Sequence, residues 1–302
     1  MNTTVTSNSA PSGGGGGIAN YDRSVTLRKS AILQNSGDGI FNRGGDLDFR
    51  NSGVSNNSGR GITQRWGHAA LDHVRIAGNT GGGTSQYYST TMLTNSTVAL
   101  NSAHDGGGIE NLVGSNYSIV NSTIVSNSAV DRGGGIRSTS GDPFGRVSAH
   151  VTLINSTVSG NSAAIGGGIE NSDDIFGAHV DVTNSTIVGN SASQAGGGVH
   201  NTNAPADADG SNSIVLRNSL VARNTAPTAP DAHEAFATFS LIGDGTGSGI
   251  PNGSGNQVGT HNTPIDPRIG ALADNGGPTR TRALLAGSPA IDAASATDCP
   301  AT

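Results

Sequence analysis

The nine residues Asn-Ser-Thr-Val-Ser-Gly-Asn-Ser-Ala, at Asn155–Ala163, are one of nine copies of the same phrase in this chain. The fourth position of the phrase is aliphatic, as at Val158, and the residue after the seventh position is always Ser or Thr. A short phrase that recurs along a chain is typical of a repeat architecture. The seventh position is Asn in every copy: Asn8, Asn35, Asn57, Asn79, Asn101, Asn127, Asn161, Asn190 and Asn224.

A Gly-rich phrase alternates with this Asn phrase. It reads Gly-Gly-Gly-Ile-Glu-Asn at Gly106–Asn111. The residue after its third position recurs every 22 residues from Ile18 to Thr84, and then at steps of 25, 27, 33 and 30. Insertions confined to one corner of a repeat map to loops on one face, which is often the binding face. The added residues fall mainly in Thr139–His150 and Asp173–His179.

A 22-residue step with three short strand-like pieces predicts one coil of a parallel β-helix. Val151 and Leu153 alternate with polar neighbours, which is the periodicity of a strand. Asn tolerates a left-handed backbone and Gly adopts it without strain, so both suit corners, such as those expected at Asn155 and Asn161. Stacked coils lie about 4.8 Å apart, and the side-chain amides of successive Asn residues would then bond in a ladder.

We therefore predict an all-β fold, a single-stranded parallel β-helix of about nine coils over residues 1–226. The composition of the chain changes toward the C-terminus, where nine of the eleven prolines lie at or beyond Pro205. Residues 227–302 are predicted to form a Pro-rich appendage packed on the side or end of the helix.

The composition agrees with a narrow, repeated core, since Gly is 47 of 302 residues and aromatic residues are only 4%. A net charge of −6 argues against nucleic acid as a partner, because nucleic-acid binding needs a basic face. No run of residues is long and apolar enough to predict a membrane-spanning helix. The single cysteine, Cys299, cannot form an internal disulfide.

The two alternating phrases resemble those of exported bacterial proteins with right-handed parallel β-helix repeats, including polymorphic outer-membrane-protein-like ones. The segment Ile265–Asp292 resembles the C-terminal "choice-of-anchor Q" module of such proteins, and Phe239–Gly247 with Gln257–Thr260 is similar to its lead-in. The resemblance implies export and a role at the cell surface or outside the cell, often adhesive. It implies no set of catalytic residues for this chain.

The chain departs from this family at both ends. Met1–Val5 lacks the basic and apolar regions of a secretion signal, so we expect the sequence to be part of a longer exported protein. Family members usually continue to a second cysteine beyond the position of Cys299. This residue is therefore either a thiol that has lost its partner or an inert thiol at a frayed end.

One outward-facing column could carry chemistry. The residue after the aliphatic position of the Gly-rich phrase is small or apolar in the early coils, as at Ala19. A charged surface ladder is the simplest interpretation of the later coils. The alternatives are an inverting glycosidase that uses the two carboxylates, or a uronate lyase with an Arg or His base. The later coils place four charged or titratable residues in the column: Glu110, Arg137, Glu170 and His200.

Two histidines, His150 and His179, occupy the same place in successive coils and would stack about 4.8 Å apart. They could share a metal ion, with a third ligand from Asp181 or from the Asp173–Asp174 loop. Solvent-facing imidazoles without a metal are the simpler expectation. No cofactor is required by the sequence. Calcium is the other ion considered, on the acidic clusters Asp46/Asp48, Asp173/Asp174, Asp207/Asp209 and Asp231/Glu234.

Few aromatic residues are placed to stack on a sugar ring. Trp66, Tyr87 and Tyr88 are the main candidates, and Phe144 and Phe176 would add to them from the long loops. Ordinary partial burial is the alternative for all five.

Three functions follow as hypotheses. The first is a non-catalytic extracellular or cell-surface protein, a rigid stalk, adhesin or glycan-binding scaffold, with a polysaccharide or host glycan as partner. The second is a polysaccharide lyase or glycoside hydrolase that uses the outward-facing column. The third is a fibre subunit, because an uncapped β-helix exposes an open strand edge that favours end-to-end self-association.

Overall fold

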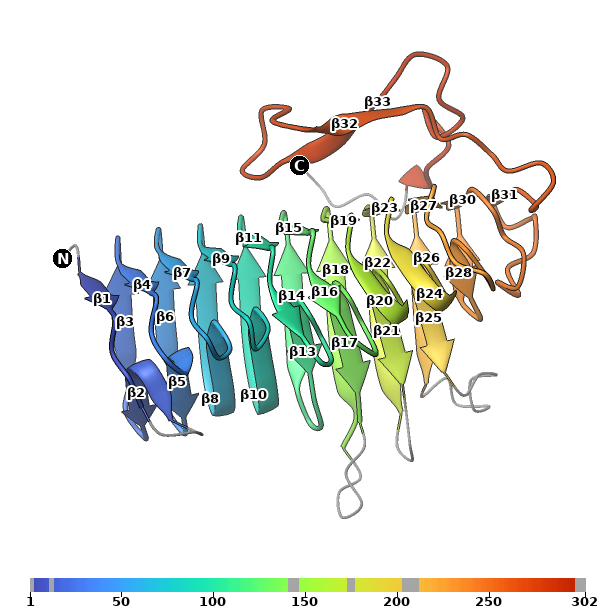
Figure 1. Cartoon of the computed structure of the whole chain (residues 1–302). Helices are drawn as coiled ribbons and strands as arrows, with labels where there is room; N and C mark the ends of the chain where they lie inside the picture. Colours follow the sequence, from blue (N-terminus) through green and yellow to red (C-terminus); the bar gives the residue numbers. More distant parts are fainter. Residues whose placement is uncertain (1–2, 11–13, 141–146, 173–176, 203–211, 297–302) are drawn as a thin grey trace.

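The computed structural model describes residues 3–10, 14–140, 147–172, 177–202 and 212–296. Within these ranges the chain forms strands, turns and connecting segments and no α-helix, which confirms the all-β prediction. No helix in the described part of the chain is long and apolar enough to cross a membrane. Successive coils stack in parallel into an elongated β-helix, as Figure 1 shows from the N-terminal blue coils to the yellow ones.

The Asn phrase supplies the first sheet. Each of its nine copies contributes one strand, and two later strands extend the stack. The strands, in stacking order, are β1 (Thr4–Thr6), β4 (Ala31–Leu33), β7 (Gly53–Ser55), β9 (Arg75–Ala77), β11 (Thr97–Ala99), β15 (Thr123–Val125), β19 (Thr157–Ser159), β23 (Thr186–Val188), β27 (Leu220–Ala222), β30 (Leu241–Ile242) and β31 (Gln257–Val258).

The second sheet has two arms that merge in two long strands, β8 (Ile62–Asp72) and β10 (Thr84–Thr94). The arm that carries the Gly-rich phrase consists of β2 (Gly15–Tyr21), β5 (Asp38–Arg43), β8, β10, β13 (Ile109–Asn111), β17 (Ile136–Thr139), β21 (Ile169–Ser172), β25 (Val199–Thr202) and β28 (Ala232–His233). The other arm consists of β3 (Val25–Arg28), β6 (Leu47–Arg50), β8, β10, β14 (Asn116–Val120), β18 (Ala149–Ile154), β22 (Ala178–Thr183), β26 (Ser213–Arg217) and β29 (Phe236–Thr238).

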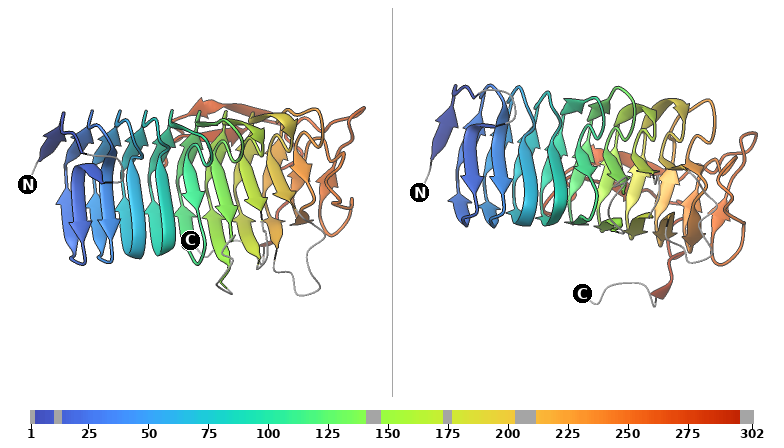
Figure 2. Two further views of the ribbon diagram at one scale, coloured as in Figure 1. Left: turned by 60° about the horizontal axis from the view of Figure 1, so that its bottom comes forward. Right: turned by 90° about the horizontal axis from the view of Figure 1, so that it is seen from below.

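A small third sheet fills the corner between the two phrases in the later coils. Its strands are β12 (Ser102–Ala103), β16 (Ser128–Ala129), β20 (Ser162–Ile165) and β24 (Ser191–Ala195). The two views of Figure 2 show the strands of successive coils lying side by side along the stack.

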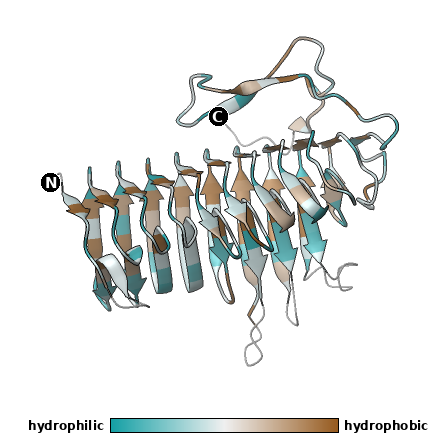
Figure 3. Cartoon of the chain, in the orientation of Figure 1, coloured by the Kyte–Doolittle hydropathy of each residue, from teal (hydrophilic) through white to brown (hydrophobic). Residues whose placement is uncertain are grey.

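The core is a narrow strip of aliphatic side chains inside the coils. The fourth position of the Asn phrase is buried in the copies after the first, as at Val98, Ile124 and Val158. Each meets the equivalent residue of the next coil, since Val98 is in register with Ile124 and Ile124 with Val158. In Figure 3 the hydrophobic residues form bands that cross the strands at the same level from coil to coil. The repeated aliphatic position is therefore a core position.

The Asn phrase turns the chain at both ends of its strand. Its first residue is left-handed, as expected for Asn155 (φ 50°). At the second corner the left-handed residue is Gly160 (φ 66°) and not Asn161, so the expectation for that position was wrong. Asn161 is constant because of its side chain. Its Oδ1 accepts from Asn127 Nδ2 at 3.0 Å, and its Nδ2 donates to Asn190 Oδ1 at 2.9 Å.

Close backbone approach explains the Gly triplets. Gly133 has a left-handed backbone (φ 66°), which favours Gly. A Cβ atom on Gly134 would lie 2.4 Å from the carbonyl oxygen of Ser162, and one on Gly135 would lie 2.5 Å from that of Gly168. Any larger residue would therefore push neighbouring coils apart.

Parallel stacking continues beyond residue 226, where the helix was expected to end. β28, β29, β30 and β31 each pair with a strand of the preceding coil. This part of the chain lacks the Asn phrase, but other side chains replace it. Asn256 Oδ1 accepts from the backbone N–H of Ser240 at 3.1 Å. One coil earlier, the acceptor of the equivalent bond, from the N–H of Ser219, is the hydroxyl of Ser240.

The C-terminal part of the described chain turns back along the side of the stack. It contains an antiparallel hairpin of β32 (Ile269–Ala273) and β33 (Thr281–Leu284), drawn in red in Figure 1. Thr279 Oγ1 donates to the carbonyl of Asn121 at 3.1 Å, and Thr123 Oγ1 donates to that of Arg280 at 2.7 Å. These bonds hold the hairpin against β15, more than 150 residues earlier in the sequence.

Candidate functional site

The outward-facing column predicted from the sequence is present as a register of neighbouring strands. Ser85 pairs with Glu110, Glu110 with Arg137, Arg137 with Glu170, and Glu170 with His200. These four residues, Glu110, Arg137, Glu170 and His200, are called the outer column below. The constant form of the Gly-rich phrase aligns them, because the residues added in these coils fall outside the phrase.

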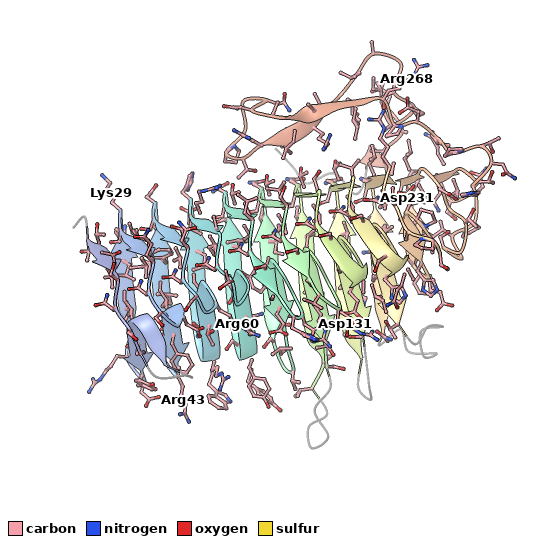
Figure 4. All side chains as sticks on the ribbon, viewed as in Figure 1. Lys29, Arg43, Arg60, Asp131, Asp231 and Arg268 are labelled. Carbon is pink, nitrogen blue, oxygen red and sulfur yellow. The ribbon has the colours of Figure 1, made fainter. Side chains whose placement is uncertain are left out.

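The outer column is buried and not an open surface. Its side chains point away from the coil interior, but the exposed fraction of the side chain is 8% at Glu110, 20% at Arg137 and 0% at Glu170. Two arginines lie across the column, since Arg60 pairs with Glu110 and Arg132 pairs with Glu170. Figure 4 labels Arg60 and Asp131, the neighbour of Arg132, in different coils but at the same height of the view.

Charges of opposite sign alternate along this buried ladder. Arg60 Nη2 lies 2.7 Å from Glu110 Oε2, and Glu110 Oε1 lies 3.7 Å from Arg137 Nη1. Arg137 Nε lies 3.6 Å from Glu170 Oε2, and Glu170 Oε1 lies 3.3 Å from Arg132 Nη1. Each carboxylate is therefore shared between two guanidinium groups.

The electrostatics of the column follow from this burial. Burial raises the pKa of Glu170 above its ordinary value, and the charges of Arg137 and Arg132 oppose that rise. Burial also lowers the pKa of His200 to about 4, and the neighbouring His233 and Arg132 add to this effect. The two imidazole rings are stacked with centroids 4.4 Å apart. His200 is therefore neutral near pH 7.

A pocket of about 400 Å³ opens at the early end of the outer column. It lies over β5, β8 and β10, where the column changes from charged to small residues. Six of the lining residues define it here as the aromatic pocket: Asp38, Phe41, Arg60, Trp66, Tyr87 and Glu110.

The rings of the aromatic pocket are held in fixed contacts. Trp66 is 46% exposed, and its ring meets Tyr87 edge to face at 5.9 Å. Tyr88 packs edge to face on Tyr87 at 4.7 Å. Two exposed arginines lie over the rings, with Arg43 Cζ 5.0 Å from Trp66 and Arg65 Cζ 5.8 Å from Phe41. Cation–π attraction accounts for both placements.

The backbone turns at these rings. Trp66 (φ 50°) and Tyr88 (φ 47°) are left-handed residues in the middle of β8 and β10, at the corner where the two arms of the second sheet meet. The long loops of the later coils connect the same two arms, between β17 and β18 for example. Phe144 and Phe176, expected to join the aromatic residues from those loops, lie outside the described residues.

The polar groups of the aromatic pocket are also ordered. Asp38 Oδ2 accepts from Thr63 Oγ1 at 2.6 Å, and Asp38 Oδ1 accepts from the backbone N–H of Arg60 at 2.9 Å. Ser85 Oγ donates to Glu110 Oε2 at 3.0 Å. The pocket thus combines ring faces with carboxylates and hydroxyls in fixed positions.

No family model, curated protein or solved structure matches this chain.

The predicted metal ligands do come together. His150 is in register with His179, and Asp181 lies between their imidazoles. Asp181 Oδ2 is 3.2 Å from His150 Nε2 and 3.1 Å from His179 Nε2. The hydrogen bonds from these two histidines hold the pKa of Asp181 far below its usual value.

In each acidic cluster that the structure describes, one carboxylate is paired or buried. Asp48 bonds to Arg28 and Arg50, and Asp231 is buried at the end of the Asn ladder. The clusters Asp173/Asp174 and Asp207/Asp209 lie outside the described residues.

Sequence reasoning missed the residues that cover the outer column and line the aromatic pocket from one side. Asp38 and Arg60 lie two residues before the aliphatic position of the Gly-rich phrase, and Arg132 lies four residues before it. The signal was a charged residue within or just before the Gly-rich phrase, two to four residues ahead of that position. The period alone did not show that such residues fold across the column.

Proposed function

We propose that this protein is a non-catalytic extracellular or cell-surface β-helix that binds a glycan in the aromatic pocket. The observation that carries the proposal is the arrangement of Trp66, Tyr87 and Phe41 around a cavity that also presents Asp38, Arg60 and Glu110. Pockets that bind small ligands combine apolar and aromatic walls with a few well-placed polar groups.

A sugar ring suits this combination. Its C–H faces pack on aromatic rings, and its hydroxyls need donors and acceptors at the edge of the ring. Trp66 is half exposed and lines the pocket, while the carboxylates of Asp38 and Glu110 can accept hydrogen bonds. The rigid stack fixes these groups before binding, which lowers the entropy cost of association.

Burial and pairing argue against a catalytic role for the outer column. A general acid or base must reach the bond that breaks, but the side chain of Glu170 is 0% exposed. Arg137 lies between the two carboxylates, where an inverting glycosidase needs room for a water molecule. Arg137 itself is paired with Glu110, Glu170 and Asp105 and is therefore a poor base.

The proposed location rests on the sequence. The Ile265–Asp292 segment resembles the C-terminal module of exported "choice-of-anchor Q" proteins, and this resemblance supports a cell-surface role. The stacked coils suit that role, since a stiff rod can hold its aromatic pocket away from an attachment point.

A glycan panel tests the proposal. The panel contains immobilised oligogalacturonate, sulfated glycans, cello-oligosaccharides and mannans, and binding is compared for the native chain, Trp66→Ala and Phe236→Ala. Phe236 is a matched control, because it is 54% exposed and lies outside the aromatic pocket. We expect at least one glycan to bind the native chain and Phe236→Ala but not Trp66→Ala.

The same panel separates binding from catalysis. Absorbance at 235 nm would reveal the unsaturated product of a lyase, and new reducing ends would reveal a hydrolase. Product formation by the native chain that is lost in Glu170→Gln would replace the proposed function with the enzyme alternative. Equal binding by the native chain and Trp66→Ala would remove the aromatic pocket as the site.

A further inference from the structure

Three side chains on two neighbouring coils converge on one point outside the aromatic pocket. His150 comes from β18, and His179 and Asp181 come from β22. Among the residues that the structure describes, they are the one group of three or more His, Cys, Asp or Glu residues whose ligand atoms lie within 4.8 Å of one another. The parallel register of β18 and β22 fixes this arrangement.

We propose that His150, His179 and Asp181 form a binding site for a transition-metal ion of the Zn²⁺ type. Two imidazole nitrogens and one carboxylate oxygen are a common ligand set for such ions. Ligand atoms about 2.0 Å from a tetrahedral ion lie roughly 3.3 Å from each other. The two distances from Asp181 Oδ2 to His150 Nε2 and His179 Nε2, 3.2 and 3.1 Å, match that edge.

Neighbouring groups hold the ligands in orientation. Arg217 Nη1 lies 2.9 Å from Asp181 Oδ1, which leaves Oδ2 for the ion. Ser213 Oγ bonds to Nδ1 of His179, the ring nitrogen that faces away from Asp181. Partners of this kind on the remote atoms of ligands are typical of metal sites, because they fix the tautomer of the ring and the direction of the carboxylate.

The site is open to solvent on one side. The exposed fraction of the side chain is 39% at His150, 27% at His179 and 24% at Asp181, so an ion can reach the three atoms without a rearrangement of the coils. Three protein ligands leave a position for water or for a donor group of a ligand.

The donor set also selects the ion. Calcium prefers six to eight oxygen ligands, whereas this site offers one carboxylate oxygen and two nitrogens. Imidazole nitrogen suits zinc and its neighbours in the first transition row. The ligands come from two coils, so a bound ion would link β18 to β22 and stabilise the folded chain over the unfolded one.

Calorimetric titration of the tag-free chain, after dialysis against EDTA, tests the proposal with Zn²⁺ and with Ca²⁺. We expect one Zn²⁺ per chain, a higher Tm with Zn²⁺ and no response to Ca²⁺. His179→Ala and Asp181→Asn should each weaken Zn²⁺ binding at least tenfold. His233→Ala is the matched control, because His200 and His233 are another pair of stacked imidazoles, and it should bind Zn²⁺ as the native chain does.

A second measurement on the native chain covers the case in which a variant fails to fold. Four-coordinate Co²⁺ absorbs visible light far more strongly than hydrated Co²⁺, so the native chain with one equivalent of Co²⁺ should show an intense visible band that Zn²⁺ abolishes. The absence of this band, a preference for Ca²⁺ over Zn²⁺, or Zn²⁺ binding that His233→Ala reduces as much as His179→Ala would each overturn the proposal.

Discussion

The side-chain amide of Asn224 donates from Nδ2 to Oδ1 of Asp231 at 2.9 Å, and this bond ends a ladder that runs through the nine copies of the Asn phrase. Each earlier Asn of the ladder, from Asn8 to Asn190, donates in the same way to the Asn of the next coil, at 2.9–3.0 Å. The amide dipoles therefore point in one direction, with their N–H ends toward the carboxylate of Asp231. Figure 4 shows Asp231 near the C-terminal end of the stack.

The ladder should be a main source of stability, and Asn127→Ala tests this. Asn127 accepts from the backbone N–H and the Nδ2 of Asn101 and donates to Asn161 and to the carbonyl of Val98. Alanine would leave these buried partners unsatisfied, so we expect a loss of roughly 2–5 kcal/mol in the free energy of unfolding. Chemical denaturation measures the loss, and Asn275→Ala on the exposed hairpin should change stability by less than about 0.5 kcal/mol.

The end of the ladder should make stability depend on pH. Burial raises the pKa of Asp231 from 3.8 to about 6, although three N–H donors act against that rise. Between about pH 4 and pH 6, the Asp231 carboxyl is therefore protonated to a greater extent in the folded chain than in the unfolded chain. Lowering the pH from 7 to 4 should add on the order of 3 kcal/mol of stability from this group.

Asp231→Asn separates this contribution from the others. The pKa of His200 is lowered to about 4 in the folded chain. Its contribution to the free energy of unfolding therefore decreases as the pH drops, which is opposite to the effect of Asp231. That effect is the same in the native chain and in the variant. We predict that the stability of the native chain relative to Asp231→Asn rises as the pH falls from 7 to 4. A constant difference across this range would show that Asp231 is ionised in the folded state.

The Gly triplets should not tolerate even a methyl group at their second position. A Cβ atom on Gly134 would lie 2.4 Å from the carbonyl oxygen of Ser162 and 2.5 Å from that of Gly167. We expect Gly134→Ala to destabilise the fold by at least about 1–3 kcal/mol. Gly53→Ala is the matched control, because the nearest atom to its Cβ, the carbonyl oxygen of Arg75, would be 3.7 Å away. An equal Tm for the two variants would mean that close coil contact does not explain the triplets.

Repetition made most of the fold predictable. The constant form of the Gly-rich phrase predicted that Glu110, Arg137, Glu170 and His200 would stack, and the strand register bears this out. Beyond residue 226 the sequence predicted only an appendage on the side or end of the helix. The docking site of the hairpin of β32 and β33 could not be predicted, because it rests on single hydrogen bonds, such as that from Thr279 to Asn121, which follow no repeat.

The candidate site was less predictable for a related reason. Alternation in a strand shows which side chains point away from the coil, but not what covers them. Arg60 lies within its Gly-rich phrase and Arg132 lies just before the phrase of Ile136. Their ion pairs with Glu110 and Glu170 make the expected surface column a buried ladder. The convergence of His150, His179 and Asp181 could be predicted, because all three lie in aligned strands.

Arginines beside the rings should favour an acidic glycan. Arg43 and Arg65 are exposed over Trp66 and Phe41, so they add positive charge at the rim of the aromatic pocket. We expect Arg65→Gln to weaken oligogalacturonate binding about two- to fivefold and to leave binding of a neutral oligosaccharide unchanged. Arg28→Gln removes an exposed arginine outside the pocket and should bind as the native chain does. Equal weakening for acidic and neutral glycans would assign Arg65 a packing role.

The fluorescence of Trp66 gives the most direct test of glycan binding, because it is the single tryptophan of the chain and it lines the aromatic pocket. Oligogalacturonate and cello-oligosaccharides are titrated into the native chain, Tyr87→Ala and Phe236→Ala at constant salt. We predict a saturable change in emission with at least one of these saccharides for the native chain and for Phe236→Ala, and a loss of that change in Tyr87→Ala. Emission that no saccharide alters, or an equal change in Tyr87→Ala, would contradict glycan binding at this pocket.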